Sequence, residues 1–348
     1  MEKERTAINS TAKIGAAIIG LGRIASLLEE DSRREKPCTH AGAISANNDC
    51  ILLAGCDKKE ERRMLFSERW NVPVYADAEE MIKAHHPEIL VIATHPDSHY
   101  HYCRLAAALC VPVVICEKPL ADTLAKSRKI SALTAAGNKR MAIITNHERR
   151  YSGDYIKAKE ILAGKKLGAI LSARAVLCMG KNQVGASPRL LDVLWHDGTH
   201  MADALMFLTD SRLIHKKQWG AKLTSSSGTA WLLNSLVSLN EQIPVILEIS
   251  AEKDHLVFEI EFSCEKGMLR IGNGVFEIWE SAECPYAEKF RSLKLANENR
   301  SFGSPTGYFA NMISDAAACA REPGRQPVSS AADGLTVIEY LNSVKAWH

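Results

Sequence analysis

The sequence has little net charge, no long hydrophobic run and no closely spaced pair of cysteines. Its 43 Lys and Arg residues nearly balance 41 Asp and Glu residues, and a net charge of +2 is too small to favour nucleic acid as a partner. No apolar run reaches the roughly 18 residues that span a bilayer, so we expect no membrane partner. Of the 348 residues, 46% are hydrophobic and 24% are charged. This composition excludes a disordered chain, a collagen and a coiled coil.

The ten cysteines lack the spacing of a metal site or a redox pair. No two of them are closer than six positions, so there is no C-x-x-C motif. Several, such as Cys56 and Cys116, lie within apolar runs, where cysteine packs as a small hydrophobic residue. We therefore expect buried, reduced thiols and a cytoplasmic protein.

The first part of the chain alternates short apolar strands with amphipathic helices. After a flexible tail at 1–12, strands are predicted at 14–20, 51–57, 72–75, 89–94, 113–116 and 141–145, and helices at 59–70, 78–85, 98–109 and 123–136. The first apolar run contains Gly15 and Gly20, so it reads as a buried strand and not as a secretion signal. Buried strands joined by helices predict a parallel sheet covered on both faces. Residues 13–146 are thus expected to form a doubly wound Rossmann domain.

The second part, residues 147–348, has closely spaced strands with tight polar connections. Strands are predicted at 170–177, 222–225, 229–239, 245–250, 255–262, 268–271 and 275–279, and helices at 155–162, 308–321 and 331–347. Lys266-Gly267 and Gly272-Asn273-Gly274 are turn signals. The pattern predicts an α+β domain with a mostly antiparallel, open sheet.

A glycine-rich motif, G-x-G-x-x-A, follows the first strand at Gly20-Leu21-Gly22-Arg23-Ile24-Ala25. In a dinucleotide fingerprint the first glycine permits a tight turn and the second lets the backbone approach a pyrophosphate. The third small residue keeps the following helix close to the strand, and that helix offers its N-terminal N–H groups to the phosphates. We expect a helix to open at this turn. The predicted cofactor contacts are Gly20, Gly22, Arg23, Ile24 and Ala25.

Asp57, at the end of the second strand, bears on the choice of cofactor. A carboxylate at this place accepts hydrogen bonds from ribose hydroxyls and repels a 2′-phosphate, which favours NAD. NADP stays open, because several basic residues follow and could hold that phosphate: Lys58, Lys59, Arg62 and Arg63.

The stretch between the glycine motif and Asp57 is longer than usual. Asp57 lies 37 residues after Gly20, against about 20 in the standard unit. The extra length is a charged insertion at 29–40. It is either a surface loop or a segment that lines the substrate cleft through Lys36, Thr39 or His40.

Two further motifs follow parallel strands, at the edge where open α/β sheets bind ligands. They are Thr94-His95-Pro96-Asp97-Ser98-His99 and Glu117-Lys118-Pro119. A lysine beside a positively charged nicotinamide can hold or pass a proton. The Lys118–Pro119 bond is a candidate for the cis form.

A histidine-rich stretch, His196-Asp197-Gly198-Thr199-His200-Met201-Ala202-Asp203, lies in the second part. If it is helical, His196, His200 and Asp203 share one face at i, i+4 and i+7. Such a set can bind zinc. However, neither the glutamate of H-E-x-x-H nor a cysteine ligand accompanies it, so we expect no metal and favour a general base facing a nicotinamide.

The order of these motifs resembles the glucose–fructose oxidoreductase / inositol dehydrogenase / rhizopine catabolism (Gfo/Idh/MocA) family. The resemblance covers the chain from Lys13 to the last helix, and Glu117-Lys118-Pro119 is its most specific piece. It implies a Rossmann domain and a C-terminal α/β domain whose open sheet forms a homodimer or homotetramer. It also implies further cofactor contacts at Thr94, Pro96, His99, Glu117, Lys118 and Asn146.

The same resemblance implies hydride transfer between a nicotinamide and an alcohol or ketone carbon of a sugar, sugar derivative or cyclitol. The family's catalytic lysine matches Lys118, and the histidine of its pattern D-x-x-x-H-x-x-D matches His200. The first Asp of that pattern is His196 here, with Asp197 one place on. The proton relay is therefore either His196 with His200, or Asp197 with His200.

Candidate substrate contacts are Lys118, Arg149, Arg174, His196, His200 and His40, with Asn182 and Arg189 as further candidates. Arg149 belongs to the stretch Asn146–Tyr151 at the domain junction, where it serves either the cleft or a salt-bridged hinge. Two other functions stay open within the same family. One is a redox-neutral glycosidase that uses NAD, and the other is a non-catalytic regulator that binds NAD and a sugar.

Overall fold

The computed structural model describes residues 12–135, 141–179, 194–225, 228–250, 253–297 and 300–344. They form two compact units, and the chain passes between them several times. The first unit contains the chain up to Glu117 together with Ala132–Ile144 and Phe309–Ser330, and the second contains Lys118–Ser131, Thr145–Tyr308 and the chain from Ala331.

The first unit is built on a six-stranded sheet with the order β3-β2-β1-β4-β5-β6. The strands are β1 (Ile14–Ile19), β2 (Cys50–Cys56), β3 (Val74–Tyr75), β4 (Ile89–Ile92), β5 (Val113–Cys116) and β6 (Ala142–Thr145). β1 pairs in parallel with both β2 and β4, so the strand order reverses direction at β1. β1, β4 and β5 are buried along their whole length, because helices cover both faces. This is the predicted Rossmann sheet.

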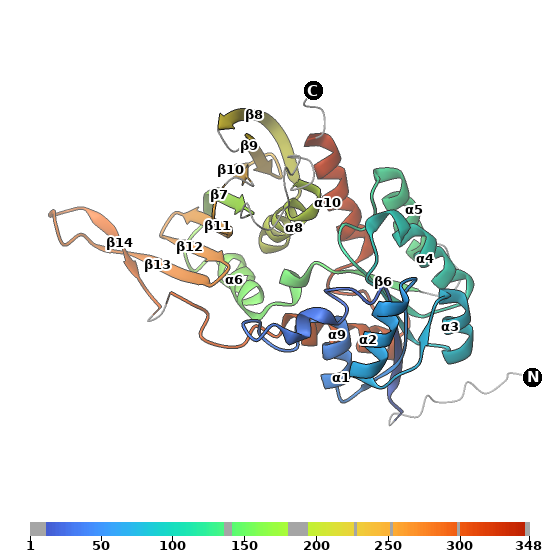
Figure 1. The fold of residues 1–348 in the computed structure, drawn as a ribbon. Helices are drawn as coiled ribbons and strands as arrows, with labels where there is room; N and C mark the ends of the chain where they lie inside the picture. Colours follow the sequence, from blue (N-terminus) through green and yellow to red (C-terminus); the bar gives the residue numbers. More distant parts are fainter. Residues whose placement is uncertain are drawn as a thin grey trace, which may run out of the picture. The chain divides into compact units, whose positions relative to one another are not determined.

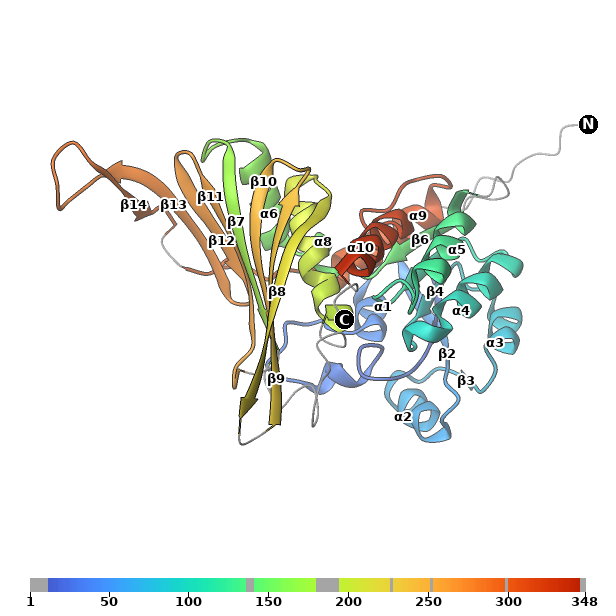
Figure 2. The same cartoon turned by 90° about the horizontal axis from the view of Figure 1, so that it is seen from above.

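Helices pack on the two sides of this sheet (Figure 1; Figure 2). α1 (His40–Ala46) and α9 (Tyr308–Arg321) lie on one side, and α3 (Ala78–His85) and α4 (Pro96–Ala108) lie on the other. α2 (Glu60–Trp70) follows β2. The chain reaches β6 through α5 (Leu124–Ala135). α9, far away in the sequence, thus completes the first unit.

The expectation of a helix opening at the glycine motif is wrong. Residues 23–26 form turns, and only a short 3-10 helix, η1 (Leu27–Glu30), follows them. The first α-helix begins at His40, the last residue of the insertion. The stretch between contains a run of charged residues and Pro37, which has no backbone N–H to continue a helix. The peptide bond before Pro37 is cis.

The second unit is built on an eight-stranded sheet with the order β14-β13-β12-β11-β7-β10-β9-β8. The strands are β7 (Ile170–Cys178), β8 (Leu213–Ser225), β9 (Gly228–Leu239), β10 (Ile243–Ser250), β11 (Val257–Cys264), β12 (Gly267–Gly272), β13 (Val275–Glu283) and β14 (Arg291–Leu295). Only the β7–β10 pair is parallel among the pairings described. The sheet is therefore mostly antiparallel, as predicted. β14 was not predicted from the sequence.

One face of this sheet is covered by helices, namely α6 (Gly153–Ala163) and α8 (Gly198–Thr209), with α10 (Ala331–Val344) packed against α8 (Figure 2). η2 (Glu148–Tyr151) leads into α6. Buried residues alternate with less buried ones along β11, because alternate side chains of a strand point to opposite faces. Phe258, Ile260 and Phe262 form part of this core.

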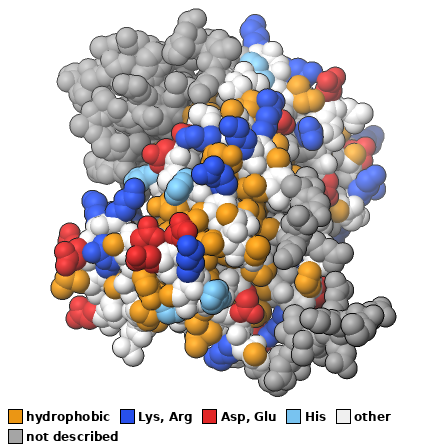
Figure 3. Space-filling view, turned by 90° about the vertical axis from the view of Figure 1, so that its right-hand side faces the viewer, with side chains coloured by type: hydrophobic (Ala, Val, Ile, Leu, Met, Phe, Trp, Pro, Cys, Tyr) orange, Lys and Arg blue, Asp and Glu red, His pale blue; other side chains and the backbone are white. Residues whose placement is uncertain are grey.

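The described surface carries both signs of charge. Acidic and basic side chains lie close to one another on the face shown in Figure 3, with hydrophobic side chains between them. The ten cysteines are all free, and seven of them are buried. Among the described residues no helix is long and apolar enough to cross a membrane.

Candidate functional site

The glycine motif forms a turn whose two glycines have different surroundings. Gly20 has φ +87°, and a Cβ there would lie 2.6 Å from the carbonyl oxygen of Ala93. Only glycine fits such a position. A Cβ on Gly22 would meet only the guanidinium of Arg62, at 3.6 Å. The backbone of the turn is thus tightly packed at Gly20 and accessible at Gly22. An accessible backbone at Gly22 fits the approach of a dinucleotide pyrophosphate.

The carboxylate of Asp57 ties the end of β2 to this turn. Oδ2 accepts a hydrogen bond from the N–H of Leu21 at 2.9 Å and lies 3.5 Å from Nη1 of Arg62, and Oδ1 accepts from the N–H of Lys59 at 2.9 Å. A carboxylate has about four acceptor sites, so Asp57 can take one more donor, such as a ribose hydroxyl. The side chain of Arg62 is 39% exposed and is placed to meet a phosphate at the same point.

The Thr94–His99 motif turns the chain from β4 into α4. Oγ1 of Thr94 bonds to Oγ of Ser98 at 2.7 Å, and Pro96 occupies the first turn of the helix. His99 is fully buried, and its Nε2 lies 3.1 Å from the carbonyl oxygen of Thr94. His99 therefore stabilises the turn, and the structure does not support a direct contact between its side chain and a cofactor. Thr94 and Pro96 are partly exposed at the carboxyl end of β4.

Glu117 directly follows β5, and its carboxylate is held by His40. Nε2 of His40 lies 2.7 Å from Oε1 of Glu117, and both side chains are buried. His40 was expected to line the substrate cleft, but it has no exposed surface. Thr39 is buried as well, and Lys36 bonds within the insertion to the carbonyl of Leu28 at 3.2 Å. The structure therefore does not support a substrate contact from His40 or Thr39.

Lys118 follows Glu117 directly and belongs to the second unit. Its bond to Pro119 is cis, as the sequence analysis proposed. Nζ of Lys118 donates a hydrogen bond of 2.8 Å to the backbone carbonyl of His196. Lys118 is thus brought together with the predicted histidine stretch through its backbone.

No single continuous helix contains His196, His200 and Asp203, so the condition under which they would share one face is not met. Residues 194–196 are helical, but the helix breaks at Asp197, and α8 begins at Gly198. His196 precedes the break, with its side chain 73% exposed and its Nδ1 2.8 Å from Oδ2 of Asp197. The side chains of His196 and Asp197 therefore form a pair at the N-terminus of α8.

Burial and nearby positive charges together lower the pKa of His200. Burial lowers its pKa well below the ordinary 6.5, and the charges of Lys118 and Arg149 lower it further. Its Nδ1 is buried and has no hydrogen-bond partner among the described residues. Burial opposes the charge of Asp197, but the hydrogen bond from His196 and the charge of Lys118 prevail and lower the pKa of its carboxyl group. The lowered pKa values favour a neutral imidazole at His200 and a carboxylate at Asp197.

Asp203 serves a different purpose from the one its spacing suggests. It is 1% exposed, and it accepts hydrogen bonds from Nε of Arg150 at 2.9 and 3.1 Å. Nη1 of Arg150 also lies 3.0 Å from Asp333 of α10. The three residues tie η2, α8 and α10 together, so Asp203 positions the helix that carries His200.

His147 is a residue of this region to which the sequence analysis gave no role. It is buried, and its Nε2 lies 3.9 Å from Oδ1 of Asp203. Neither ring nitrogen has a hydrogen-bond partner among the described residues. Burial lowers its pKa. Its only sequence signal is its place beside Asn146, which is itself buried.

The remaining predicted substrate contacts lie apart from this cluster or are engaged elsewhere. The guanidinium of Arg149 stacks on the ring of Phe258 at 3.7 Å and bonds to Asn273 at 3.4 Å. Arg174 is 63% exposed and points away from the helix-covered face of the sheet, because its neighbours Ala173 and Ala175 are buried on that face. The further candidates Asn182 and Arg189 lie outside the described residues.

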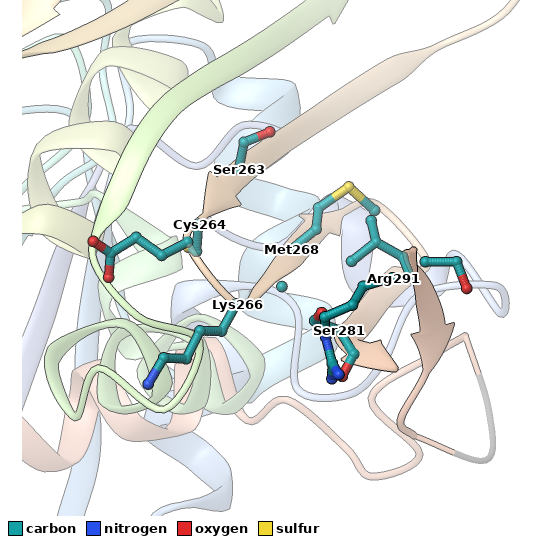
Figure 4. Close-up of a pocket in the computed structure, with 10 residues that line it drawn as sticks. Ser263, Cys264, Lys266, Met268, Ser281 and Arg291 are labelled. Carbon is teal, nitrogen blue, oxygen red and sulfur yellow. The ribbon is translucent and has the colours of Figure 1, made fainter. Parts of the chain in front are cut away.

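A cavity of about 250 Å³ lies elsewhere in the second unit, at one end of β11, β12 and β14 (Figure 4). Among its lining residues, Arg291 donates hydrogen bonds to Ser281 at 2.7 and 2.8 Å. No predicted site residue lines it. Among the described residues, no group of three or more His, Cys, Asp or Glu side chains could hold a metal ion.

Comparisons with known proteins agree with this fold. Residues 14–145 match the profile of a family described as "oxidoreductase family, NAD-binding Rossmann fold". The uncharacterized oxidoreductase YhhX of Escherichia coli is 28% identical, over 34% of this chain and only 32% of that protein. An inositol 2-dehydrogenase/D-chiro-inositol 3-dehydrogenase of Shouchella clausii is 25% identical over 91% of this chain and 93% of its own length.

Solved structures resemble the whole chain at low sequence identity. An oxidoreductase from Agrobacterium radiobacter, crystallised with NAD+, L-tartaric acid and magnesium, superposes with a TM-score of 0.71. It is 17% identical and covers 95% of each chain. At this identity the likeness establishes the shared fold.

The lowered pKa values of His147 and His200 predict that acid destabilises the protein. In the unfolded chain both imidazoles bind a proton as the pH falls through about 6.5, whereas in the folded protein their pKa values lie lower, that of His200 well below. The free energy of unfolding therefore decreases below that pH. His200→Gln should make the slope shallower by about one proton, or roughly 1.4 kcal/mol per pH unit.

Urea unfolding between pH 7.5 and 5 measures this slope. His147→Gln is the matched comparison, and the double variant should lose both contributions. An unchanged slope in His200→Gln would show that this imidazole is not held neutral.

Proposed function

We propose that the chain, whose residues 14–145 match the NAD-binding Rossmann fold of the Gfo/Idh/MocA oxidoreductase family, is an NAD(P)-dependent dehydrogenase or reductase of a sugar, sugar derivative or cyclitol. The observation that carries this proposal is the cluster formed by Lys118, Asp197 and His200. It joins a hydrogen-bond donor of fixed position to an imidazole that is held neutral. These are the groups that oxidation of an alcohol requires.

A nicotinamide dinucleotide, when bound, accepts the hydride during oxidation or supplies it during reduction. Gly22 offers an open backbone to the pyrophosphate, and Asp57 offers an acceptor to the ribose. Thr94 and Pro96 lie at the next strand end along this edge. These residues would hold the dinucleotide, and Ile24 and Ala25 would hold the turn in shape.

In the oxidation direction, His200 takes the proton of the substrate hydroxyl. It can do so at neutral pH because its imidazole is uncharged. Lys118 donates a hydrogen bond to the same oxygen and stabilises the negative charge that develops there. The carbonyl of His196 fixes where the ammonium group of Lys118 lies, and Asp197 offsets its charge. General base catalysis contributes roughly 10²–10⁴-fold, and a positioned donor adds about 10²–10³-fold.

The relative from Shouchella clausii, which bears the name of an inositol dehydrogenase, supports a cyclitol as the first substrate to test. The pairing of His196 with Asp197 supports a relay in which Asp197 takes the role of the family's carboxylate. Two functions of the same family remain as alternatives, the redox-neutral glycosidase and the non-catalytic regulator. We also propose that the protein works in the cytoplasm.

The direct test mixes the protein with NAD or NADP and a panel of cyclitols, free sugars, sugar phosphates and nucleotide sugars. We expect the nicotinamide absorbance band to grow with at least one of them. Lys118→Ala should then lower kcat by about 10²–10³-fold, and His200→Ala by about 10²–10⁴-fold. Lys126→Ala is the matched control, because Lys126 pairs with Asp122 on the surface of α5.

The outcomes separate the candidate functions. Turnover by Lys118→Ala within about tenfold of the native rate would refute the catalytic assignment. Binding of NAD without net reduction would favour the glycosidase or the regulator. Failure to bind either dinucleotide would contradict the reading of the glycine turn.

The surroundings of Asp57 predict NAD as the preferred cofactor. Asp57 presents a carboxylate where NADP carries its phosphate, but Arg62 lies beside it. Asp57→Ser should therefore lower kcat/KM for NAD by about 10-fold and raise the NADP:NAD ratio of kcat/KM, since a lost charge-assisted hydrogen bond costs about 1.5–3 kcal/mol. Glu79→Gln removes an exposed carboxylate from the same unit and should leave the ratio unchanged. An unchanged ratio in Asp57→Ser would show that this carboxylate does not select the cofactor.

We further propose that the open face of the eight-stranded sheet forms a homodimer or homotetramer interface. Leu236 and Ile246 lie opposite each other on β9 and β10, and Arg174 lies beside Ile246 on the same face. Ile246 is 50% exposed. Ile246→Glu should shift the sedimentation velocity toward that of the monomer. Leu256→Glu, which changes an exposed leucine before β11, is the control. A native protein that sediments as a monomer would contradict the proposal.

A further inference from the structure

The pair formed by His40 and Glu117 has no part in the proposed chemistry, although it adjoins Lys118. Nε2 of His40 lies 2.7 Å from Oε1 of Glu117, between residues 77 positions apart in the chain. His40 is 0% exposed and Glu117 is 7% exposed. Burying a carboxylate costs free energy unless a hydrogen-bond partner compensates for the lost water. His40 is such a partner for Glu117. This contact joins the first residue of α1 to the last residue before the proposed catalytic lysine.

The backbone at His40 is fixed to the glycine turn. The N–H of His40 donates to the carbonyl of Ile24 at 3.2 Å, and the N–H of Ala41 donates to the carbonyl of Ala25 at 2.9 Å. Ile24 and Ala25 are the last two residues of the G-x-G-x-x-A motif. The His40 side chain therefore extends from a backbone that is anchored to the dinucleotide turn.

The insertion at 29–40 secures this arrangement from the other side. Oε2 of Glu29 accepts hydrogen bonds from Oγ1 of Thr39 at 2.5 Å and from the N–H of Cys38 at 3.3 Å. Thr39 in turn caps α1 by accepting from the N–H of Gly42 at 3.1 Å. Gly42 packs so closely on the Glu29 carboxylate that a Cβ there would collide with it. The insertion thus folds back and fixes the start of α1.

The ring of His40 is also held by packing. It meets the ring of Phe309 edge-on, with 5.0 Å between the ring centroids, and α1 and α9 lie side by side in both ribbon views (Figure 1; Figure 2). Nδ1 of His40 has no hydrogen-bond partner among the described residues. The tautomer with its proton on Nε2 fits these contacts, because Nε2–H then donates to Glu117 and Nδ1 carries only a lone pair.

Together these contacts connect the glycine turn to Lys118 through a short path of fixed groups. The path runs from Ala25 and Ile24 to the backbone of α1, through the ring of His40 to Glu117, and along one peptide bond to Lys118. From these contacts we propose that His40 is a positioning residue, which fixes the carboxyl end of β5 and so sets the place of the Lys118 ammonium group. The role of His40 in turnover rests on the proposed dehydrogenase function.

The physical reason is that catalysis by a donor such as Lys118 depends steeply on position. A displacement of about 1 Å at a reacting group can cost about 10²-fold in rate. Without the His40 donor, Glu117 would be a buried carboxylate lacking this partner, and it would move toward water. Lys118, one residue further on, would move with it. Binding of the dinucleotide at Gly22 would be affected less, because the glycine turn keeps its own hydrogen bonds.

Three substitutions at His40 separate the donor from the ring. In His40→Gln the amide nitrogen takes about the place of Nε2, whereas in His40→Asn it takes about the place of Nδ1. We expect His40→Ala and His40→Asn to lower kcat by about 10–10²-fold, with KM and the Kd for NAD changed less than about threefold. His40→Gln should recover most of the lost kcat. Calorimetry measures the Kd of each variant.

The matched control is His85→Ala. His85 belongs to the same unit, bonds to the hydroxyl of Tyr75 at 2.9 Å and meets its ring edge-on at 5.4 Å. The substitution thus removes a histidine hydrogen bond and a ring contact of the same kind, away from Lys118. Its kcat should stay within about twofold of the native value. If His85→Ala lost as much kcat as His40→Ala, the loss in both variants would be explained by a less stable fold and not by the position of Lys118.

A second readout follows Lys118 without turnover. Reductive methylation at limiting reagent, with peptide mass spectrometry, gives the labelling rate of Lys118 relative to Lys126. We expect His40→Ala to change that ratio at least twofold and His40→Gln to leave it near the native value. Because this measurement needs no substrate, it distinguishes the two proposals. If the native protein turns over nothing but the ratio follows the His40 donor, the proposed function fails and the positioning contact stands.

Two results would overturn the positioning role. One is an unchanged Lys118 labelling ratio in folded His40→Ala, whatever its activity. The other is a His40→Gln variant as impaired in kcat as His40→Ala, with both folded as judged by their melting temperatures. Either result would mean that His40 only packs the core beside Phe309.

Discussion

The parallel direction of the first sheet is the constraint on which the rest of the site depends. Because six strands run the same way, the glycine turn after β1, Asp57 after β2, Thr94 after β4 and Glu117 after β5 all leave the sheet at one edge. The reversal of strand order at β1 is where such sheets bind ligands. At Gly20 the turn after β1 approaches the backbone after β4 so closely that an added Cβ would overlap the carbonyl of Ala93. This parallel arrangement brings the glycine turn, Asp57, Thr94 and Glu117 to one edge of the first unit.

Charge gives the second unit its chemical character. Burial lowers the pKa of His200, and the charges of Lys118 and Arg149 lower it further, so the neutral imidazole is favoured. The same region balances its positive groups with carboxylates that are fully engaged, as Asp203 is by Arg150. Breaking such a buried pair leaves an uncompensated charge. Asp203 and Arg150 therefore stabilise the fold. His200 differs from them because its Nδ1 lacks a partner among the described residues, as expected of a group that a ligand completes.

Much of the fold could be predicted because periodicity and turn residues act locally. α3, α9 and β5 begin and end where the sequence predicts, since each has a clear apolar pattern between polar or glycine-rich boundaries. The helix expected at the glycine motif failed, because the motif describes a turn and says nothing of an insertion that delays the helix until His40. β14 was missed because its residues are largely exposed. The segment forms a strand because it pairs with β13, and this pairing has no signal in the local sequence pattern.

A candidate site could be proposed from the sequence, but its geometry could not be predicted. The spacing of His196, His200 and Asp203 places them on one face only if a single helix contains all three residues. Because the helix breaks at Asp197, the i, i+4, i+7 spacing no longer predicts a shared face; the helical period applies only within one continuous helix. Likewise, no local pattern reports that His40 contacts a residue 77 positions away.

The break at Asp197 also explains how a histidine can stand where the family pattern has an aspartate. At position 196 it is the backbone carbonyl that accepts the hydrogen bond from Lys118, and any residue can supply a carbonyl. The side chain of His196 turns outward and bonds to Asp197, so the carboxylate is displaced by one residue. Its charge stays close enough to Lys118 that the lysine lowers the pKa of Asp197. The substitution thus preserves an acceptor and a negative charge near the lysine, while placing an exposed imidazole where the family pattern has a carboxylate.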